Sequence, residues 1–384
     1  MTIKGEYRRI ADKSTSEGIR VAGKGDICAI RQIWHDIFTT DEEYLDIIFN
    51  SLYPLLDAFA YTIAGEIVSV AFAIPITLVQ KDEATNDLTS ESSKIMESDC
   101  KSTCECHNKS TKKLNGRYLY GVATIEEARG KGLSRKLVKQ IREHYTAAGE
   151  DFIITRPAEE SLFSFYKSQG FTQSLYRREI TISNNTASQN TSEANSPALY
   201  SSDKTQETQS RLDAAKLYTL RKDIYTNYFE WSSPILECII KLARAEDNLI
   251  KYYPDKEKYF IAHYESRSEN SANPNIISQT QTANQYKRLV VEETNFNSFE
   301  ELLIHIDTAV KNNNYGAKSN CEFAMIPKEI VLLLPSRGDY WLSEHRTNFN
   351  KIKENVTEFA LCMPLSNEMA TVLTSECFFN FTME

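Results

Sequence analysis

The sequence predicts an α/β (α+β) fold of two domains in tandem, each a mixed twisted sheet flanked by helices. Three observations lead to this prediction. A strand, a glycine-containing turn, a helix and a second strand follow one another within residues 118–155, an order that places helices against a sheet. The order strand, helix, strand returns loosely in residues 288–334. Between the two parts lies a polar segment, residues 182–211, dominated by Ser, Thr, Asn and Gln.

This polar segment has the composition of a linker, because it cannot bury enough apolar surface to offset the entropy lost on ordering. We therefore expect a first domain at residues 1–181, a linker at residues 182–211 and a second domain at residues 212–384. Residues 81–115 and 266–285 are similarly polar. We expect them to be flexible insertions, one within each domain.

Hydrophobic periodicity predicts the elements of the first domain. Trp34 and Phe38 have helical spacing, and the apolar positions of a later helix fall on one face from Leu133 to Tyr145, with Gly149 as its C-terminal cap. The predicted helices are residues 29–38, 41–51, 133–148 and 160–169. Apolar runs separated by turn residues predict strands, the first two of which form a hairpin. The predicted strands are residues 58–62, 67–78, 118–124, 152–155 and 171–180.

The second domain repeats this mixture without the glycine turn. Leu302 and Ile306 lie on the apolar face of a strongly amphipathic helix. The predicted helices are residues 214–228, 233–245 and 298–313. The predicted strands are residues 258–264, 288–293, 322–326, 329–334 and 358–363.

The overall composition restricts the class of partner. The 44 Lys and Arg residues against 53 Asp and Glu give a net charge of −9, which disfavours nucleic acid because its binding needs many basic contacts to phosphates. The longest apolar stretch, residues 67–79, is too short to span a membrane. Residues 1–20 contain no apolar core of a signal peptide. We therefore expect a cytoplasmic protein with no nucleic-acid or membrane partner.

The segment with the most chemical information is the turn between residues 124 and 133. Its sequence Arg129-Gly130-Lys131-Gly132 opens a helix, so several backbone N–H groups lack partners within the helix and the positive end of the helix dipole lies behind them. Such a site binds anions, including a pyrophosphate. The glycines let the backbone approach phosphate oxygens. The spacing fits neither the P-loop nor the dinucleotide fingerprint.

This turn resembles the acetyl-CoA-binding motif of the GNAT N-acetyltransferases, Gln/Arg-x-x-Gly-x-Gly/Ala. Here the motif reads Arg129-x-x-Gly132-x-Ser134, in which the serine is a departure. A second GNAT signature, Tyr-x-x-x-Gly-Phe, is matched from Tyr166 to Phe171. The two motifs stand in the family's order on the expected elements, and the resemblance covers about residues 20–180.

The resemblance implies an enzyme that moves an acetyl group from acetyl-CoA to a primary amine, by direct attack in a ternary complex. Tyr166 would protonate the leaving CoA thiolate. Backbone groups of the motif strand would bind the pantetheine arm, namely Val122, Ala123 and Thr124. The turn and first helical residues would bind the pyrophosphate, namely Arg129, Gly130, Lys131, Gly132, Leu133 and Ser134. Acetyl-CoA is then the co-substrate, and no metal is expected.

The resemblance extends to a GNAT subset, the Eis-like enzymes, that carries a second, degenerate GNAT-like domain. Many family members have an Asn seven residues before the tyrosine, where this chain has Glu159, and the run from Arg156 to Glu160 is similar to that subset. Eis-like enzymes can place their C-terminal carboxylate in the active site. The apolar tail ending at Glu384 is either such an element or an ordinary last strand.

The proton acceptor for the amine is less well defined. Glu126 is the candidate taken here, because it follows the motif strand directly, and the others are Glu127, Asp57, Glu66 and His35. Four aromatic residues would line an acceptor pocket or belong to the core. They are Trp34, Phe38, Tyr53 and Phe59.

The eight cysteines do not indicate a disulfide framework. Five are scattered and are expected to be free thiols. The cluster Cys100, Cys104, Cys106 and His107 contains zinc-ligand types, but its spacing fits no zinc motif. We interpret it as part of the first polar insertion.

Two other functions are compatible with part of the sequence. A GNAT fold can serve as a non-catalytic CoA-binding or regulatory module, although Gly132 and Tyr166 are both present. A tandem GNAT-like aminoacyl transferase would lack the intact turn. The acceptor of the enzyme would be a small molecule or a peptide amine, and a homo-oligomer is compatible with the sequence.

Overall fold

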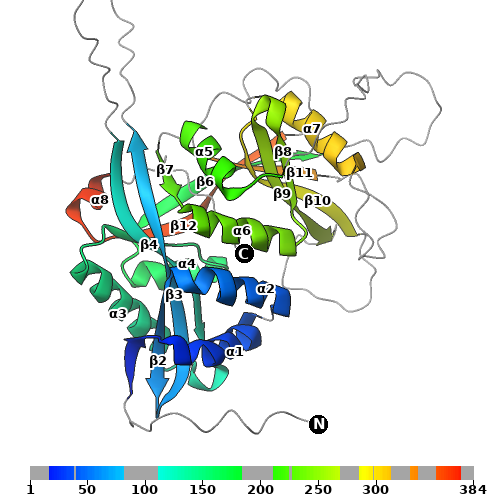
Figure 1. Cartoon of the computed structure of the whole chain (residues 1–384). Coiled ribbons are helices and arrows are strands. Elements are labelled where there is room, and N and C mark those ends of the chain that lie inside the picture. The colour runs from blue at the N-terminus through cyan, green and yellow to red at the C-terminus, as the bar shows by residue number, and fades with distance from the viewer. Residues whose placement is uncertain are drawn as a thin grey trace, which may run out of the picture.

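The computed structural model describes residues 17–38, 40–81, 111–183, 211–224, 227–268, 285–296, 298–312, 329–335 and 352–372. In these ranges the chain is a mixed α/β structure in which helices flank one large mixed sheet (Figure 1), as the sequence predicts. No helix in these ranges is long and apolar enough to cross a membrane.

The first part of the chain contains every helix and strand that its periodicity predicts. Its helices are α1 (Ile27–Phe38), α2 (Glu42–Ile47), α3 (Leu133–Ala147) and α4 (Glu160–Ser168). Its strands are β1 (Gly18–Val21), β2 (Asp57–Ile63), β3 (Glu66–Lys81), β4 (Thr111–Thr124), β5 (Phe152–Thr155) and β6 (Gln173–Ser183). Side-chain hydrogen bonds to the backbone define some of the helix ends. Asp41 caps α2, because its carboxylate accepts a hydrogen bond from the Tyr44 N–H at 2.7 Å.

The second part is also an alternation of helices and strands. Its helices are α5 (Ala214–Ile224), α6 (Ser233–Ala245), α7 (Phe299–Asn312) and α8 (Asn367–Val372). Its strands are β7 (Asn227–Glu230), β8 (Leu249–Tyr253), β9 (Lys258–Ser268), β10 (Gln285–Thr294), β11 (Glu329–Pro335) and β12 (Ile352–Pro364).

Several boundaries differ from those predicted. The predicted insertion at residues 81–115 is shorter, since β4 already begins at Thr111 and pairs with β3 out to Lys81. The predicted helix 214–228 ends earlier, at Ile224, and residues 227–230 form β7 instead. There Phe229 lies opposite Leu78 of β3, so pairing with a distant strand overrides the local helical pattern.

The sequence analysis missed β8, which pairs with β9 across a short turn at Pro254–Lys256. Its residues Leu249–Tyr253 are few and do not alternate cleanly between apolar and polar types, so periodicity gives little signal. The predicted strand at residues 322–326 lies outside the described residues.

The strands form one continuous sheet in the order β1-β2-β3-β4-β5-β12-β6-β11-β10-β9-β8, with β7 paired to β3. Strand β12, from the end of the chain, lies between β5 and β6 and is antiparallel to both. The two domains predicted on either side of residues 182–211 therefore remain a prediction. The sheet contains strands from both sides of that segment.

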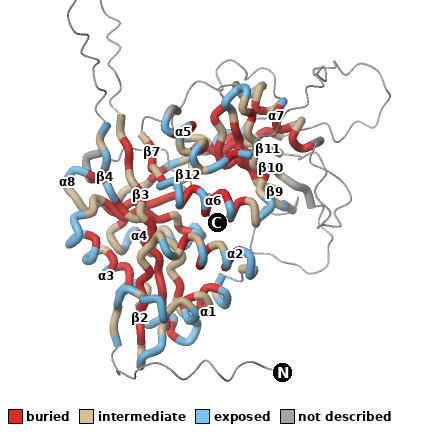
Figure 2. Tube along the Cα trace, in the orientation of Figure 1, coloured by how far each residue is buried: buried red, intermediate tan, exposed pale blue. Residues whose placement is uncertain are grey.

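The helices cover both faces of the first part of this sheet. Helices α3 and α4 pack on one face, with Leu137 and Ile141 buried against Leu119 and Ile153. Helices α1, α2 and α6 belong to a separate cluster on the other face. A further cluster packs α7 onto β8–β11. Buried residues accordingly follow the strands through the middle of the molecule (Figure 2).

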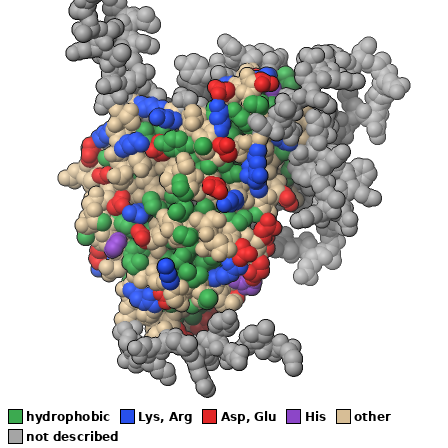
Figure 3. All heavy atoms as spheres, in the orientation of Figure 1, with side chains coloured by type: hydrophobic (Ala, Val, Ile, Leu, Met, Phe, Trp, Pro, Cys, Tyr) green, Lys and Arg blue, Asp and Glu red, His purple; other side chains and the backbone are tan. Residues whose placement is uncertain are grey.

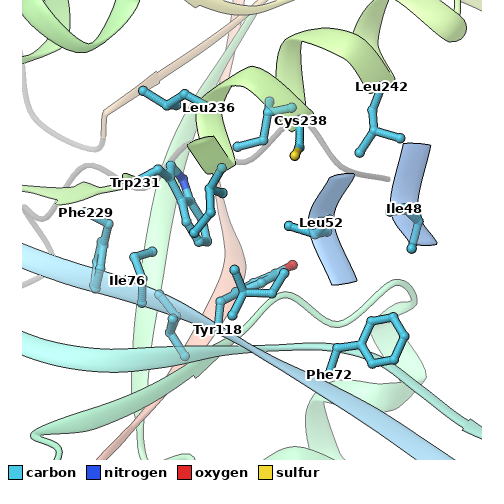
Figure 4. Packing of buried hydrophobic residues seen from close by; sticks show 14 of the residues in the cluster. Ile48, Leu52, Phe72, Ile76, Tyr118, Phe229, Trp231, Leu236, Cys238 and Leu242 are labelled. Carbon is cyan, nitrogen blue, oxygen red and sulfur yellow. The ribbon is translucent and has the colours of Figure 1, made fainter. Parts of the chain in front are cut away.

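Helix α6 joins the two parts of the chain through this core. Its side chains Cys238 and Leu242 face Leu52 and Ile48 from the segment that follows α2, whereas Leu236 lies beside Trp231 (Figure 4). Leu52 and Leu242 are each 0% exposed, so the apolar contact between the two parts is fully desolvated. The relative position of the two parts is thereby fixed by a shared hydrophobic core.

Candidate active site

Strand β4 has a bulge at Gly121. On β3, Val70 and Phe72 pair with Ala123 and Tyr120, so two residues of β4 lie opposite a single residue of β3. Such a bulge leaves a residue out of the hydrogen-bonded ladder and bends the strand. Gly121 has φ +58°, and a Cβ there would lie 2.0 Å from the ring of Trp34. Both the backbone conformation and the close approach of the indole therefore require glycine.

Beyond this point β4 separates from its neighbour β5. The two parallel strands pair from Gly116 with Phe152 to Tyr118 with Ile154, and no farther. Thr155, the last residue of β5, still donates its hydroxyl hydrogen bond to the Leu119 carbonyl at 3.0 Å. The sheet therefore opens next to the bulge.

A cavity of about 440 Å³ occupies this opening. It is lined by Trp34, Phe38, Thr40, Tyr44, Tyr118, Leu119, Tyr120, Gly121, Val122, Thr155, Arg156, Pro157, Ala158, Leu162, Tyr166 and Glu246. Leu119 and Tyr166 belong to the cluster beneath α3 and α4, whereas Trp34 and Tyr118 belong to the cluster beneath α1 and α6. The cavity therefore connects the two faces of the sheet.

Tyr166 is held in this cavity by α4. The residue is 7% exposed, and its ring packs edge-on against Phe171 at 5.4 Å between centroids. Burial raises the pKa of Tyr166 to about 12, and a hydrogen bond to the Thr155 side chain opposes that rise. The phenol is therefore protonated throughout the physiological pH range and can donate a proton.

The turn before α3 contains two glycines in the left-handed region. Gly130 and Gly132 have φ of +74° and +70°, and a Cβ at either would meet no atom within 4 Å, so the space beside both is open. Gly132 is the N-cap of α3, whose first turn contains no acidic residue. The exposed Arg129 and Lys131 are anchored on the preceding loop, through hydrogen bonds to the carbonyls of Thr124 (3.1 Å) and Glu127 (3.0 Å).

The remaining motif residues connect this turn to β4. Val122 lines the cavity, while Ala123 and Leu133 are buried. The Ser134 hydroxyl lies 2.9 Å from the Thr124 hydroxyl, and Ser69 of β3 lies 2.8 Å from the latter. The serine that departs from the family motif thus ties the first turn of α3 to β4.

The candidate proton acceptors lie elsewhere. Glu126 is exposed on a short 3-10 helix (Glu126–Ala128) and is not among the residues lining the cavity. Asp57 accepts hydrogen bonds from Tyr145 and Arg117. Glu66, Glu127 and His35 are exposed and are also absent from the lining.

Only part of the aromatic set lines the cavity. Trp34 and Phe38 do, with ring centroids 4.8 Å apart. Tyr53 stacks on Phe49 at 5.6 Å, and Phe59 packs under α3. Phe59 is thus a core residue, and Tyr53 is partly buried against the core.

The sequence analysis missed Tyr44, Tyr120 and Glu246 as lining residues. The hydroxyls of Tyr44 and Tyr120 lie 3.2 Å apart, and burial is the main cause that raises the pKa of both phenols. Glu246, at the C-terminal end of α6, adds to the rise through its negative charge. These residues are far apart in the chain and carry no motif, so only the packing of α2 and α6 reveals them.

Two predictions fall outside the described residues. They concern the cluster Cys100, Cys104, Cys106 and His107, and the C-terminal carboxylate of Glu384. Among the residues that the structure does describe, no group of three or more His, Cys, Asp or Glu side chains is arranged to hold a metal ion.

Comparisons with known proteins agree with this geometry. A family model described as FR47-like protein matches residues 109–180. A probable N-acyltransferase from Enterococcus faecalis V583 is similar in structure, with 10% identity and a TM-score of 0.54, over 92% of this chain and 74% of that one. A GCN5-related N-acetyltransferase from Kribbella flavida gives 11% identity and a TM-score of 0.53, over 92% and 72% of the chains.

Eis1 from Mycobacterium abscessus is also similar, with 10% identity and a TM-score of 0.50, over 92% of this chain and 75% of that one. A comparison with curated proteins gives no match. Identities at this level show a shared fold and nothing finer. The expected resemblance is confirmed at that level: the chain has the fold of the GNAT N-acetyltransferases, and its β4–β6 region carries the FR47-like sequence pattern.

Proposed function

We propose that this protein transfers an acetyl group from acetyl-CoA to a primary amine by direct attack in a ternary complex. The cavity that passes through the opening between β4 and β5 is the observation that carries the proposal. Two substrates can reach a common point in such a cavity from opposite faces of the sheet. Tyr166 lies on the α3 face of that point, and Trp34 and Tyr118 lie on the other.

The residues around α3 fit acetyl-CoA. A pyrophosphate needs unpaired N–H groups, positive charge and a close backbone approach, and the left-handed Gly130 and Gly132 beside Arg129 and Lys131 supply them. The β4 residues Val122–Thr124 lead from this turn to the cavity and would hold the pantetheine arm through backbone groups. When bound there, acetyl-CoA supplies an acetyl group activated as a thioester.

Tyr166 would hold the proton that the departing thiolate needs. Its pKa of about 12 keeps that proton on the hydroxyl until a stronger base forms beside it. The Thr155 side chain orients the phenol, and it is itself held by the Leu119 carbonyl. Backbone N–H groups freed by the bulge at Gly121 are suited to stabilise negative charge that develops on the acetyl oxygen.

The amine must be neutral before it attacks, so a base or a water chain has to remove its proton. Glu126 was the candidate taken from the sequence. Its exposed position on the 3-10 helix means that a role for it requires water molecules between its carboxylate and the cavity. Removing this carboxylate should then reduce the rate without affecting acetyl-CoA binding.

The alternative, a CoA-binding module without catalysis, differs from the enzyme in one measurable respect. A module binds acetyl-CoA and leaves the acetyl group in place when amines are added. The intact turn and the buried Tyr166 in the cavity favour the enzyme.

The first test is a calorimetric titration of acetyl-CoA into the wild type and into Gly132→Glu. A glutamate at residue 132 would place a side chain and a negative charge where the pyrophosphate is expected. Gly149→Glu is a matched control: Gly149 lies beyond the other end of α3, has φ +77°, and also has open space around it. Both variants incur a similar strain of about 1–2 kcal/mol from a side chain in the left-handed region.

We expect saturable binding by the wild type and by Gly149→Glu, and its loss in Gly132→Glu. Acetylation of a mixture of primary amines, followed by mass spectrometry, then separates the enzyme from the module. No binding by the wild type at millimolar acetyl-CoA would overturn the proposal. Equal binding by both variants would move the donor site away from α3.

A further inference from the structure

The indole N–H of Trp34 is a buried hydrogen-bond donor at the cavity. Trp34 lies on α1, lines the cavity and is 2% exposed. Within the described part of the chain, its Nε1 atom has no hydrogen-bond partner. Acidic side chains gather at the surface near α2 in Figure 3, whereas Trp34 belongs to the apolar cluster that contains α1 and α6. A buried tryptophan N–H usually has a partner, and an unpaired one retains its cost of desolvation, so this donor calls for an explanation.

The core holds the indole ring in one orientation. The ring stacks on Phe72, with centroids 4.8 Å apart and planes at 14°. Phe49 lies edge-on to it at 6.2 Å, and Tyr120 is tilted against it at 5.4 Å. Because a close-packed interior resists rearrangement, the ring cannot easily turn its N–H toward another group of the protein. The direction of this donor is therefore set before any ligand binds.

The edge of the indole that bears the N–H lies against the bulge of β4. A Cβ at Gly121 would lie 2.0 Å from Cζ2, 2.7 Å from Cη2 and 2.9 Å from Cε2 of Trp34, and Cε2 is the ring carbon bonded to Nε1. A left-handed bulge residue and an unpaired donor thus coincide where β4 separates from β5. Neither feature is favourable for folding, and such local departures are expected at functional sites.

The chemistry of acetyl transfer limits what this donor can bind. An indole N–H donates and cannot accept a hydrogen bond. The amine nitrogen needs its lone pair for the attack. The thioester sulfur would take the proton of Tyr166, which belongs to the cluster beneath α3 and α4 and not to that of Trp34. The remaining acceptor at the point of transfer is the acetyl oxygen.

We infer that the Trp34 N–H donates a hydrogen bond to the acetyl oxygen, beside the backbone N–H groups at the Gly121 bulge; this inference rests on the proposed function. As the amine nitrogen bonds to the carbonyl carbon, the π electrons of the C=O bond move to the oxygen, which becomes an anion. They return when the C–S bond breaks, and its electron pair leaves with the sulfur, which takes the Tyr166 proton. The proton of the amine passes to the base or water chain. A fixed donor at the developing anion stabilises the transition state more than the ground state, so Trp34 is a catalytic residue.

Replacing Trp34 with 3-benzothienylalanine tests the contact, because sulfur takes the place of the N–H in a ring of nearly the same shape. With an amine that the wild type acetylates, kcat should fall by roughly 100-fold or more, while KM for the amine and the affinity for acetyl-CoA change by only a few-fold. The same replacement at Trp231 is the matched control, since Trp231 is 1% exposed and does not line the cavity. Its kcat should be unchanged. An unchanged kcat in the Trp34 variant, or an equal loss in both variants, overturns the inference.

A second measurement requires no acetyl transfer. In protein labelled with [15N-indole]tryptophan, the Trp34 resonance is assigned by its loss in Trp34→Phe. Its indole proton should shift downfield on addition of acetyl-CoA, because the N–H gains a partner. CoA is the matched ligand, because it lacks the acetyl oxygen and should not cause this shift. A shift with acetyl-CoA alone supports the inference even if no amine is acetylated. The same resonance position with both ligands overturns it while leaving acetyl transfer intact.

Discussion

Tyr166 shows at the scale of one residue how burial prepares a group for chemistry. A phenol in water has a pKa of about 10, and burial in the cavity moves the pKa of Tyr166 to about 12. The shift makes the phenol a weaker acid, but in the proposed reaction it would keep the proton on the phenol until a basic thiolate forms. The cost of the buried hydroxyl is reduced by its hydrogen bond to the Thr155 side chain.

Replacing Tyr166 with phenylalanine should lower kcat by roughly 100- to 10,000-fold, the usual contribution of a general acid, with little change in acetyl-CoA affinity. Steady-state kinetics and calorimetry measure the two quantities. Tyr145→Phe is the matched control, because Tyr145 is equally buried but bonds Asp57 outside the cavity. It should lower stability by about 0.5–1.5 kcal/mol and leave kcat unchanged; a similar loss of kcat in both variants would refute the assignment.

The pH dependence of the wild type follows from the same shift. Since Tyr166 stays protonated until the pH approaches about 12, kcat should show no alkaline fall near the ordinary tyrosine pKa of about 10. In the unfolded chain the phenol ionises first, so the contribution of Tyr166 to stability is complete below that pH and is lost as the pH rises toward about 12. A profile of kcat against pH checks the first expectation, and chemical denaturation at several pH values checks the loss of stability.

At the scale of an element, β12 is the strand that completes the sheet beside the cavity. Leu361 and Cys362 pair with Thr155 and Ile154 of β5, and both are 0% exposed. The strand that carries Thr155 is thus paired on one side with β4 and on the other with β12. Thr155 in turn is hydrogen-bonded to Tyr166 and orients its phenol.

Truncating Leu361 to alanine should lower the free energy of unfolding by about 2–5 kcal/mol, because a fully buried leucine leaves a cavity. Urea denaturation measures the loss. Val356→Ala on the same strand is the control, since Val356 is 59% exposed and should change stability by less than about 0.5 kcal/mol. Comparable losses in both variants would mean that β12 does not pack as described.

At the scale of the whole molecule, the two parts of the chain share one sheet and one core. Strand β12 lies between β5 and β6, β7 pairs with β3, and Trp231 packs edge-on against Tyr118 at 5.7 Å between centroids. A boundary drawn in the chain at residues 182–211 is therefore crossed by both strand pairing and core packing in the described structure.

A fragment ending at residue 183 should not fold to a stable domain. It would lack β12 and the α6 cover, and would expose the edges of β5 and β6. Differential scanning calorimetry should show one cooperative transition for the full chain and none for the fragment. A cooperative transition in the fragment, with retained acetyl-CoA binding, would instead show that the predicted first domain folds by itself.

The sequence by itself determined the elements and the donor half of the site. Periodicity located α1, α3 and α6 within a few residues, and the turn from Arg129 to Ser134 predicts an anion site, because these features depend only on neighbours along the chain. The short β8 was not predicted because its few residues give little periodic signal, and β7 was not predicted because its partner β3 is far away in the sequence.

Only the tertiary structure decided the acceptor half and the relation of the two parts. Glu246, Tyr44 and Tyr120 line one cavity because α6 packs on α2. Strand β12 lies next to Thr155 because it pairs with both β5 and β6. Contacts of this kind are set by shape and by burial between distant segments, which periodicity along a single sequence does not encode. The motif thus predicts where acetyl-CoA would bind, and the packing determines which residues line the cavity beside it.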